Sequence, residues 1–353
     1  SAESRRALAH AIARRPEERF DGVLRSLAAS EDPLVVREVA AAMSAAPRRA
    51  FLETLREMLA VRDARRDARA ALVALGEPAF DYLARSLEDT SLPLRIRRHI
   101  PRTISRFDTD RAGPVLLSRL NVDPEGTVRF KILRGLGSLR RRHPNLPLDN
   151  AVLDESIEAN IRRLLELLDW RLSLLRTAAD APERITPVHT LIVELLEHKE
   201  THATERLFRL FSLRYPREDF KKIHRGAISG DPKARASARE LLENVLQPPM
   251  TDAVLGLLDD IPDAQRLAAG RAYYRAERRS TVEAFRVLLE QDSVALRSLV
   301  AHHVVELGDP ALRAELGAQC DAAFAAMSAM EQDPDADPGS ASSKERAFVV
   351  PIR

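Results

Sequence analysis

Two stripes of basic side chains are the residues of this sequence best suited to binding chemistry. In residues 95–107 the basic residues recur three or four positions apart, while Ile96, Ile100 and Phe107 fall between them. An α-helix here would carry cations on one face. A second stripe follows 134 − 102 = 32 residues later. The candidate partner-binding residues are Arg95, Arg98, Arg102, Arg106, Lys131, Arg134 and Arg141.

Arginine side chains bind carboxylates and phosphates through two-point contacts. If helices packed side by side brought Arg102 next to Arg134, the stripes would adjoin and attract a carboxylate, a phosphate or an anionic lipid headgroup. The alternative is a solvated surface whose cations are paired with Glu and Asp residues from neighbouring helices. The sequence leaves both interpretations open.

Two histidines have a spacing that suits a metal ion. His198 and His202 lie one helical turn apart, and Glu194 is available as a third ligand. The segment lacks the His-Glu-x-x-His pattern of zinc proteases, so a solvated helix is the simpler interpretation. His303 falls within an apolar helical face and is expected in the core. We therefore predict no metal site.

No arrangement of residues predicts catalysis. Ser, Thr and Cys320 occur without a nucleophile motif, and no glycine-rich loop follows a strand. Trp170, Tyr273 and Tyr274 are too few and too scattered to stack nucleic-acid bases. We predict that the chain is not an enzyme and binds no cofactor.

The composition restricts the class of protein further. The chain has 55 basic and 53 acidic residues, a net charge of +2, which argues against a protein built mainly to coat nucleic acid. Cys320 is the only cysteine, so no intrachain disulfide is possible and a reducing compartment is expected. No apolar run approaches ~18 residues, no signal peptide opens the chain, and the first residue is Ser. We expect a segment of a longer protein.

A turn followed by an apolar residue and Arg recurs along the chain. The intervals are 69 − 37 = 32, 97 − 69 = 28, 129 − 97 = 32, 266 − 235 = 31 and 297 − 266 = 31. A fixed period near thirty residues is typical of a stacked repeat array. The recurring turn and Arg residues are Asp32, Arg37, Arg69, Arg97, Asp123, Arg129, Asp231, Arg235, Arg266 and Arg297.

Each repeat is predicted to be a helical hairpin. Asp-Pro begins a helix, because Asp caps free backbone N–H groups and Pro fits the first turn. Apolar residues then follow three and four apart, and a shorter apolar helix precedes each turn, as at residues 79–87. We predict an all-α array over residues 1–330, atypical longer helices over 149–228 that include 155–175 and 187–213, a last helix over 309–330, and a linker or tail over 331–353.

This pattern resembles the HEAT repeat, one of the armadillo-like helical repeats. The resemblance implies a right-handed α-solenoid in which the turn Asp and the following Arg bond across neighbouring repeats as a ladder. It also implies that the second helices line a concave wall. Two copies depart from the pattern, since Pro93 has no Asp before it and Arg266 follows Gln265.

A more specific resemblance lies in residues 202–216, 218–219, 229–246 and 296–308. These segments look like the HEAT portion of certain bacterial membrane proteins, in which a multi-span segment related to ADP/ATP translocases precedes the HEAT array. The resemblance covers roughly residues 95–310. It implies a domain at the cytoplasmic face of the bacterial inner membrane, and no transport residue can be mapped onto this chain.

These observations predict a non-enzymatic interaction or regulatory scaffold. Its expected partner is another protein, a neighbouring domain of the same chain or an anionic lipid surface. A nucleic-acid-binding protein similar to HEAT-like DNA glycosylases is the alternative, although the near-neutral charge and scarce aromatic residues argue against it. No residue favours a HEAT-like lyase.

Overall fold

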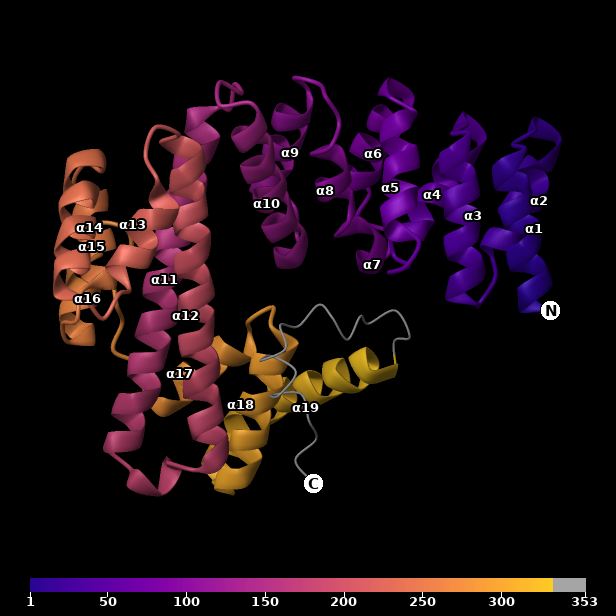
Figure 1. Cartoon of the computed structure of the whole chain (residues 1–353). Coiled ribbons are helices and arrows are strands. Elements are labelled where there is room, and N and C mark those ends of the chain that lie inside the picture. The colour runs from indigo at the N-terminus through magenta and orange to yellow at the C-terminus, as the bar shows by residue number, and fades with distance from the viewer. Residues whose placement is uncertain (333–353) are drawn as a thin grey trace. The chain divides into compact units, whose positions relative to one another are not determined.

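The computed structural model describes residues 1–332, and over that range the chain is helical, with no β-strand (Figure 1). The all-α class expected from the sequence is confirmed. The chain divides into two compact units, residues 1–153 (unit 1) and residues 154–353 (unit 2). Of the predicted tail at 331–353, the residues after Gln332 lie outside the described part of the chain. Within residues 1–332, no helix is long and apolar enough to cross a membrane.

Unit 1 consists of short helices in two layers. Helices α1, α3, α5, α8 and α10 each contact the next in that order, and the helices between them in the sequence pack against this row (Figure 1). The elements are α1 Ala2–Arg14, η1 Glu18–Phe20, α2 Asp21–Ala28, α3 Pro33–Ala45, η2 Arg49–Phe51, α4 Leu52–Met58, α5 Arg65–Ala74, α6 Glu77–Glu88, α7 Leu94–Arg97, α8 Ile100–Ile104, α9 Ala112–Leu120 and α10 Gly126–Arg142.

The Asp-Pro turns begin helices for the expected reason. The Asp32 carboxylate accepts a hydrogen bond from the Leu34 N–H at 2.9 Å, and Pro33 is the first residue of α3. The apolar residues three and four positions later, among them Val36, Val39 and Met43, are buried. Because no helix is stable at this length alone, the buried face against its neighbours holds each helix in place.

One turn–Arg pair forms a buried ion pair between neighbouring hairpins. The Arg97 Nη2 lies 2.5 Å from Oδ1 of Asp123, and both side chains are almost completely buried. The same Asp123 oxygen accepts the Glu125 N–H at 2.9 Å. Because Asp123 is drawn into the interior, α10 begins at Gly126 rather than at Pro124.

The other members of the expected ladder have different partners. Arg129 donates to the carbonyl groups of Asp123 and Pro124, and Arg235 donates to that of Ser229 at 2.8 Å. Each guanidinium therefore ties down the turn that precedes its own helix instead of reaching the next repeat. The expected ladder is wrong at these two positions.

Four further ladder residues also lack a bond to the next repeat among the contacts of the described residues. The Asp231 carboxylate caps its own helix through the Lys233 N–H at 3.1 Å. Arg37 pairs with its neighbour Glu38 at 2.8 Å. Arg266 pairs with Asp263 and donates to the Leu257 carbonyl, and the Arg297 Nε is buried without a hydrogen-bond partner. A carboxylate that caps its own helix has less freedom to accept from a neighbouring hairpin.

Unit 2 is built around two long helices. The elements are α11 Asn150–Ala179, η3 Pro182–Arg184, α12 Pro187–Arg214, α13 Phe220–Ala227, α14 Pro232–Val245, α15 Met250–Leu258, α16 Asp263–Ala269, α17 Thr281–Leu289, α18 Val294–Leu307 and α19 Pro310–Gln332. Helices α11 and α12 exceed the predicted ranges of 155–175 and 187–213.

The two long helices run antiparallel side by side (Figure 1). Arg214 near the end of α12 pairs with Asp154 near the start of α11 at 2.7 Å, and Arg171 near the end of α11 pairs with Glu200 at 2.7 Å. Arg171 also lies 3.1 Å from Asp263 at the start of α16. This buried arginine therefore joins three helices and is neutralised by carboxylates.

A second buried ion pair holds the irregular segment 271–280 against α11. The Asp169 side chain is 0% exposed, and one of its oxygens accepts from Arg279 at 2.5 Å and from the Tyr274 hydroxyl at 2.9 Å. Burial and the nearby Asp169 carboxylate raise the pKa of Tyr274 to about 12, so the phenol stays protonated and donates. Beyond the turn in which the Tyr274 N–H donates to the Gly270 carbonyl, the segment has no regular structure, and this network positions it.

Candidate anion-binding site

The basic residues come together where α8 of unit 1 contacts α5 on one side and α10 on the other. Helix α10 approaches α8 closely at Gly135, where an added Cβ would lie 3.1 Å from the Pro101 carbonyl oxygen and 3.1 Å from Leu116. A larger residue would force the helices apart, so the missing side chain permits the close approach. The cationic side chains of both helices are thereby brought to one surface.

The first predicted stripe is not a single helical face. Helix α7 ends at Arg97, and α8 begins at Ile100 after a turn. Pro101 lacks the N–H that would continue an unbroken helix, which explains the break. Arg98 lies in this turn, is buried, and donates from Nε to the His99 Nε2 at 3.3 Å. The prediction that Arg95, Arg98, Arg102 and Arg106 share one helical face is therefore wrong.

The cations of the two stripes meet around Lys131. Burial lowers the pKa of its ammonium, and the next largest causes are the positive charges of Arg134, Arg98, Arg102 and Arg65. The Lys131 Nζ and the Arg134 guanidinium each lie 6.0 Å from the centroid of the Phe130 ring. The Lys131 side chain is half-buried, whereas those of Arg102 and Arg134 are exposed.

Arg69 is the most unusual member of the group. Its side chain belongs to α5, is 9% exposed, and donates from Nε to the Thr103 hydroxyl of α8 at 3.3 Å. Its Nη2 is buried without a hydrogen-bond partner. Burial and the charges of Arg102, Arg106 and Arg65 lower the pKa of Arg69 to about 10. The cause is visible in the sequence, since the following turn lacks the Asp that pairs with Arg97 one repeat later.

His99 adds a neutral group to the same surface. Burial and the charges of Arg65, Arg98, Arg69 and Lys131 lower the pKa of its imidazole to about 3. The ring is therefore uncharged at physiological pH and accepts from Arg98 through Nε2. We refer to the following eight residues as the basic cluster: Arg65, Arg69, Arg98, His99, Arg102, Arg106, Lys131 and Arg134.

Two predicted residues lie outside the basic cluster. Arg95 is exposed in α7, and Arg141 is exposed near the end of α10. The residues flanking Arg141 bind backbone instead: Arg140 donates to the Leu146 carbonyl at 2.7 Å, and Arg142 donates to the Ser105 carbonyl. Conversely, sequence reasoning missed Arg65 and His99 as members of the cluster and placed Arg69 in the ladder. The one signal in the sequence that Arg69 would lack a carboxylate partner was the missing Asp before Pro93.

The histidine candidates show no complete metal site. The Nε2 atoms of His198 and His202 lie 3.1 Å apart, but no group of three His, Cys, Asp or Glu residues in the described part of the chain could hold a metal ion. His303 is fully buried, and its ring lies 5.3 Å from that of Phe285.

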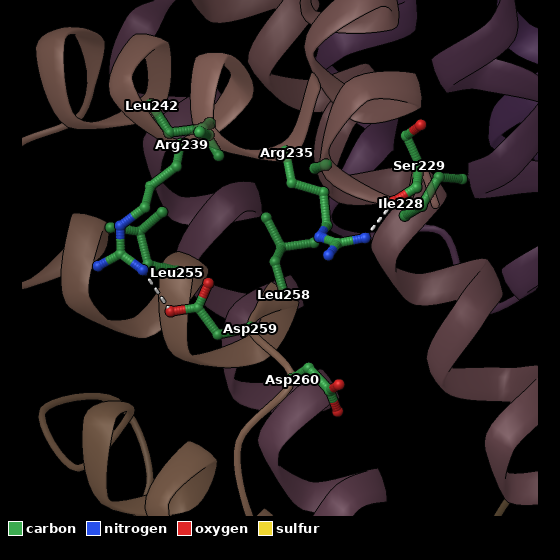
Figure 2. Close-up of a pocket in the computed structure, with 11 residues that line it drawn as sticks. Ile228, Ser229, Arg235, Arg239, Leu242, Leu255, Leu258, Asp259 and Asp260 are labelled. Carbon is green, nitrogen blue, oxygen red and sulfur yellow. Dashed lines mark hydrogen bonds and ion pairs between the residues drawn. The ribbon is translucent and has the colours of Figure 1, made fainter. Parts of the chain in front are cut away.

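A cavity of about 350 Å³ lies between α13, α14 and α15 in unit 2 (Figure 2). Three of its charged groups are already engaged, since Arg239 pairs with Asp259 at 2.6 Å and Arg235 donates to the Ser229 carbonyl, while Asp260 is exposed at the edge. Leu242, Leu255 and Leu258 supply much of the remaining wall. Because the polar groups bind one another rather than point together into the cavity, this site is less suited to a charged ligand than the basic cluster.

No protein-family model matches the sequence, and no curated protein is similar enough to count as a match. The functional argument therefore depends on the residues and their geometry.

Proposed function

We propose that the chain is a non-enzymatic interaction module, an α-solenoid of HEAT-like helical hairpins, that binds an acidic segment of a protein partner through the basic cluster. The observation that carries the proposal is the environment of Lys131, whose largest electrostatic neighbours are all cations from α5, α8, α10 and the turn between α7 and α8. Cations gathered at one surface repel one another, and an anionic partner relieves that repulsion.

Three observations support the repeat architecture. The helices of unit 1 pack in chain order, the Arg97–Asp123 ion pair joins consecutive hairpins, and the turn-and-Arg period persists into unit 2. In a right-handed solenoid of this kind, the row of helices that holds the basic cluster would line the concave face. A concave wall of fixed helices suits an extended or helical partner, because the wall loses little conformational entropy on binding.

The setting of the module is a further part of the proposal. The resemblance of residues 202–216, 218–219, 229–246 and 296–308 to the HEAT portion of translocase-like bacterial membrane proteins supports a place at the cytoplasmic face of the inner membrane. A partner there would be a protein or a neighbouring domain of the same chain.

The test is binding of the full chain to a labelled peptide of Glu and Ala, followed by fluorescence anisotropy. The variant R102E/R134E reverses two exposed charges of the basic cluster. We expect at least about tenfold weaker binding, or ~1.4 kcal/mol, with an unchanged melting temperature. The control variant R14E/R25E changes the net charge equally at exposed positions in α1 and α2 and should bind as the wild type does.

Equal binding by R102E/R134E and the wild type would contradict the proposal. Duplex DNA serves as a comparison ligand. Tighter binding of DNA than of the peptide, with a steep loss of affinity as salt rises, would favour the nucleic-acid alternative instead.

A further inference from the structure

We infer that the basic cluster selects a phosphoryl group, so that the partner segment carries a phosphorylated side chain bound between Lys131, Arg102 and Arg134. This inference rests on the proposed function and names the partner's chemistry. Lys131 and Arg134 lie one turn apart on α10, both within 6.0 Å of the Phe130 ring, and α10 contacts α8, which carries Arg102.

The charge of the site favours a dianion over a carboxylate. A carboxylate brings one negative charge and two oxygens, whereas a phosphate monoester brings nearly two charges and three acceptor oxygens. Four arginines act on Lys131, and the charges of Arg69 and Arg106 act on one another. A compact dianion reduces the repulsion within this group more than a single carboxylate does.

Arg69 strengthens the field from behind the binding surface. Its charge is buried, its Nη2 has no hydrogen-bond partner, and its Nε contacts α8 only through the Thr103 hydroxyl. A buried cation without a carboxylate partner is screened poorly by water, so its attraction for an anion at the surface is stronger than that of an exposed arginine. Arg69 is therefore a positioning residue that acts through Arg102.

The titration of the ligand offers a sharp signature. A phosphate monoester loses its second proton near pH 6, whereas Glu titrates near pH 4.3. His99 remains neutral over this range because its pKa is about 3, and Arg69, with a pKa of about 10, remains charged. His143 follows the last residue of α10, its Nε2 lies 3.7 Å from Asp108, and an H143N variant serves as the control for this side chain.

The experiment compares three peptides of one sequence that carry phosphoserine, Glu or Ser at one position, with the full chain held at constant ionic strength. At pH 7 we expect the phosphopeptide to bind about tenfold more tightly than the Glu peptide, equivalent to ~1.4 kcal/mol. This preference should fall several-fold as the pH is lowered from 7 to 5, and inorganic phosphate should compete. H143N should behave as the wild type does.

Lys131→Met should weaken the binding of both acidic peptides and abolish the preference for the phosphopeptide, while the melting temperature stays unchanged. Equal affinities of wild type for the phosphoserine and Glu peptides would overturn the inference. If R102E/R134E still loses the Glu peptide, the proposed function survives that outcome. Binding to vesicles that contain phosphatidic acid, with no preference among the peptides, would also overturn the inference and assign the phosphate to a lipid.

Discussion

Units 1 and 2 both bury arginine side chains, but they neutralise them differently. In unit 2, Arg279 pairs with Asp169 and Arg171 pairs with Glu200 and Asp263. In unit 1, Arg97 pairs with Asp123, whereas Arg69 contacts a threonine hydroxyl and has a buried Nη2 without a partner. A buried arginine with a carboxylate holds helices together, and one without a carboxylate adds positive potential to the surface in front of it.

The difference follows from what each unit must position. Unit 2 fixes the irregular segment 271–280 and two long helices, so its buried charges are used for cross-links. Unit 1 already positions its short helices by packing each against the next in the row. It therefore tolerates one buried cation without a counterion, and this is the place where the other basic residues gather.

The largest effect is expected from breaking a neutralised pair in unit 2. Arg279→Met leaves Asp169 buried with only the Tyr274 hydroxyl and one backbone N–H to compensate it. We expect a loss of about 3–5 kcal/mol in the free energy of unfolding. Trp170, the only tryptophan, neighbours Asp169 and reports on this unit in urea unfolding followed by fluorescence. Arg278→Met, at an exposed neighbouring position, should shift the stability by less than about 0.5 kcal/mol. An unchanged midpoint for Arg279→Met would show that the pair is not a cross-link.

A smaller effect is expected from acidification, again in unit 2. Burial and the nearby His189 lower the pKa of His303 to about 4, below its ordinary 6.5. Between these values the unfolded chain binds a proton that the folded chain does not, so the stabilisation present above pH 6.5 is lost as the pH falls to about 4. At ~1.4 kcal/mol per pKa unit, the loss from this residue is at most about 3.5 kcal/mol.

Urea unfolding followed by Trp170 fluorescence at several pH values measures this loss. His303→Asn should make the dependence shallower, although His189 and His224, whose pKa values are also lowered by burial, retain part of it. His10→Asn, at an exposed position in α1, should leave it unchanged. A dependence that is just as steep in His303→Asn would remove His303 from the explanation.

The sequence predicted the elements better than the contacts between them. Helices α3, α14 and α19 begin at the prolines of Asp32-Pro33, Asp231-Pro232 and Asp309-Pro310, because capping and the geometry of proline act locally. The break at Pro101 was also a local signal, and we missed it by giving the spacing of the arginines more weight than the proline.

The candidate site depended on information that is not local. Arg65 and Arg69 joined the basic cluster because α5 contacts α8, which only the packing of one hairpin on the next determines. Likewise, Asp169 binds side chains more than a hundred residues away along the chain. Spacing within a single helix predicts which residues share a face. The period of the repeats gave only the expectation that Arg102 lies near Arg134, because the packing of α8 on α10 is needed to bring them together.

The smallest effect in stability is also the one that separates the two kinds of buried arginine most directly. Arg69→Met removes a buried charge. Only one 3.3 Å hydrogen bond, to the Thr103 hydroxyl, compensates that burial, and the charges that act on Arg69 are those of other arginines. We expect a change within about 1 kcal/mol, and in the stabilising direction, because the methionine fills similar space without the cost of desolvation. Arg97→Met in the same unit is the matched control and should lower the free energy of unfolding by about 3–5 kcal/mol, since it leaves Asp123 buried without its arginine partner.

Thermal unfolding followed by circular dichroism compares the two variants. If Arg69→Met were as destabilising as Arg97→Met, Arg69 would be a structural cross-link like those of unit 2, and its contribution to the positive surface would no longer explain why it is there.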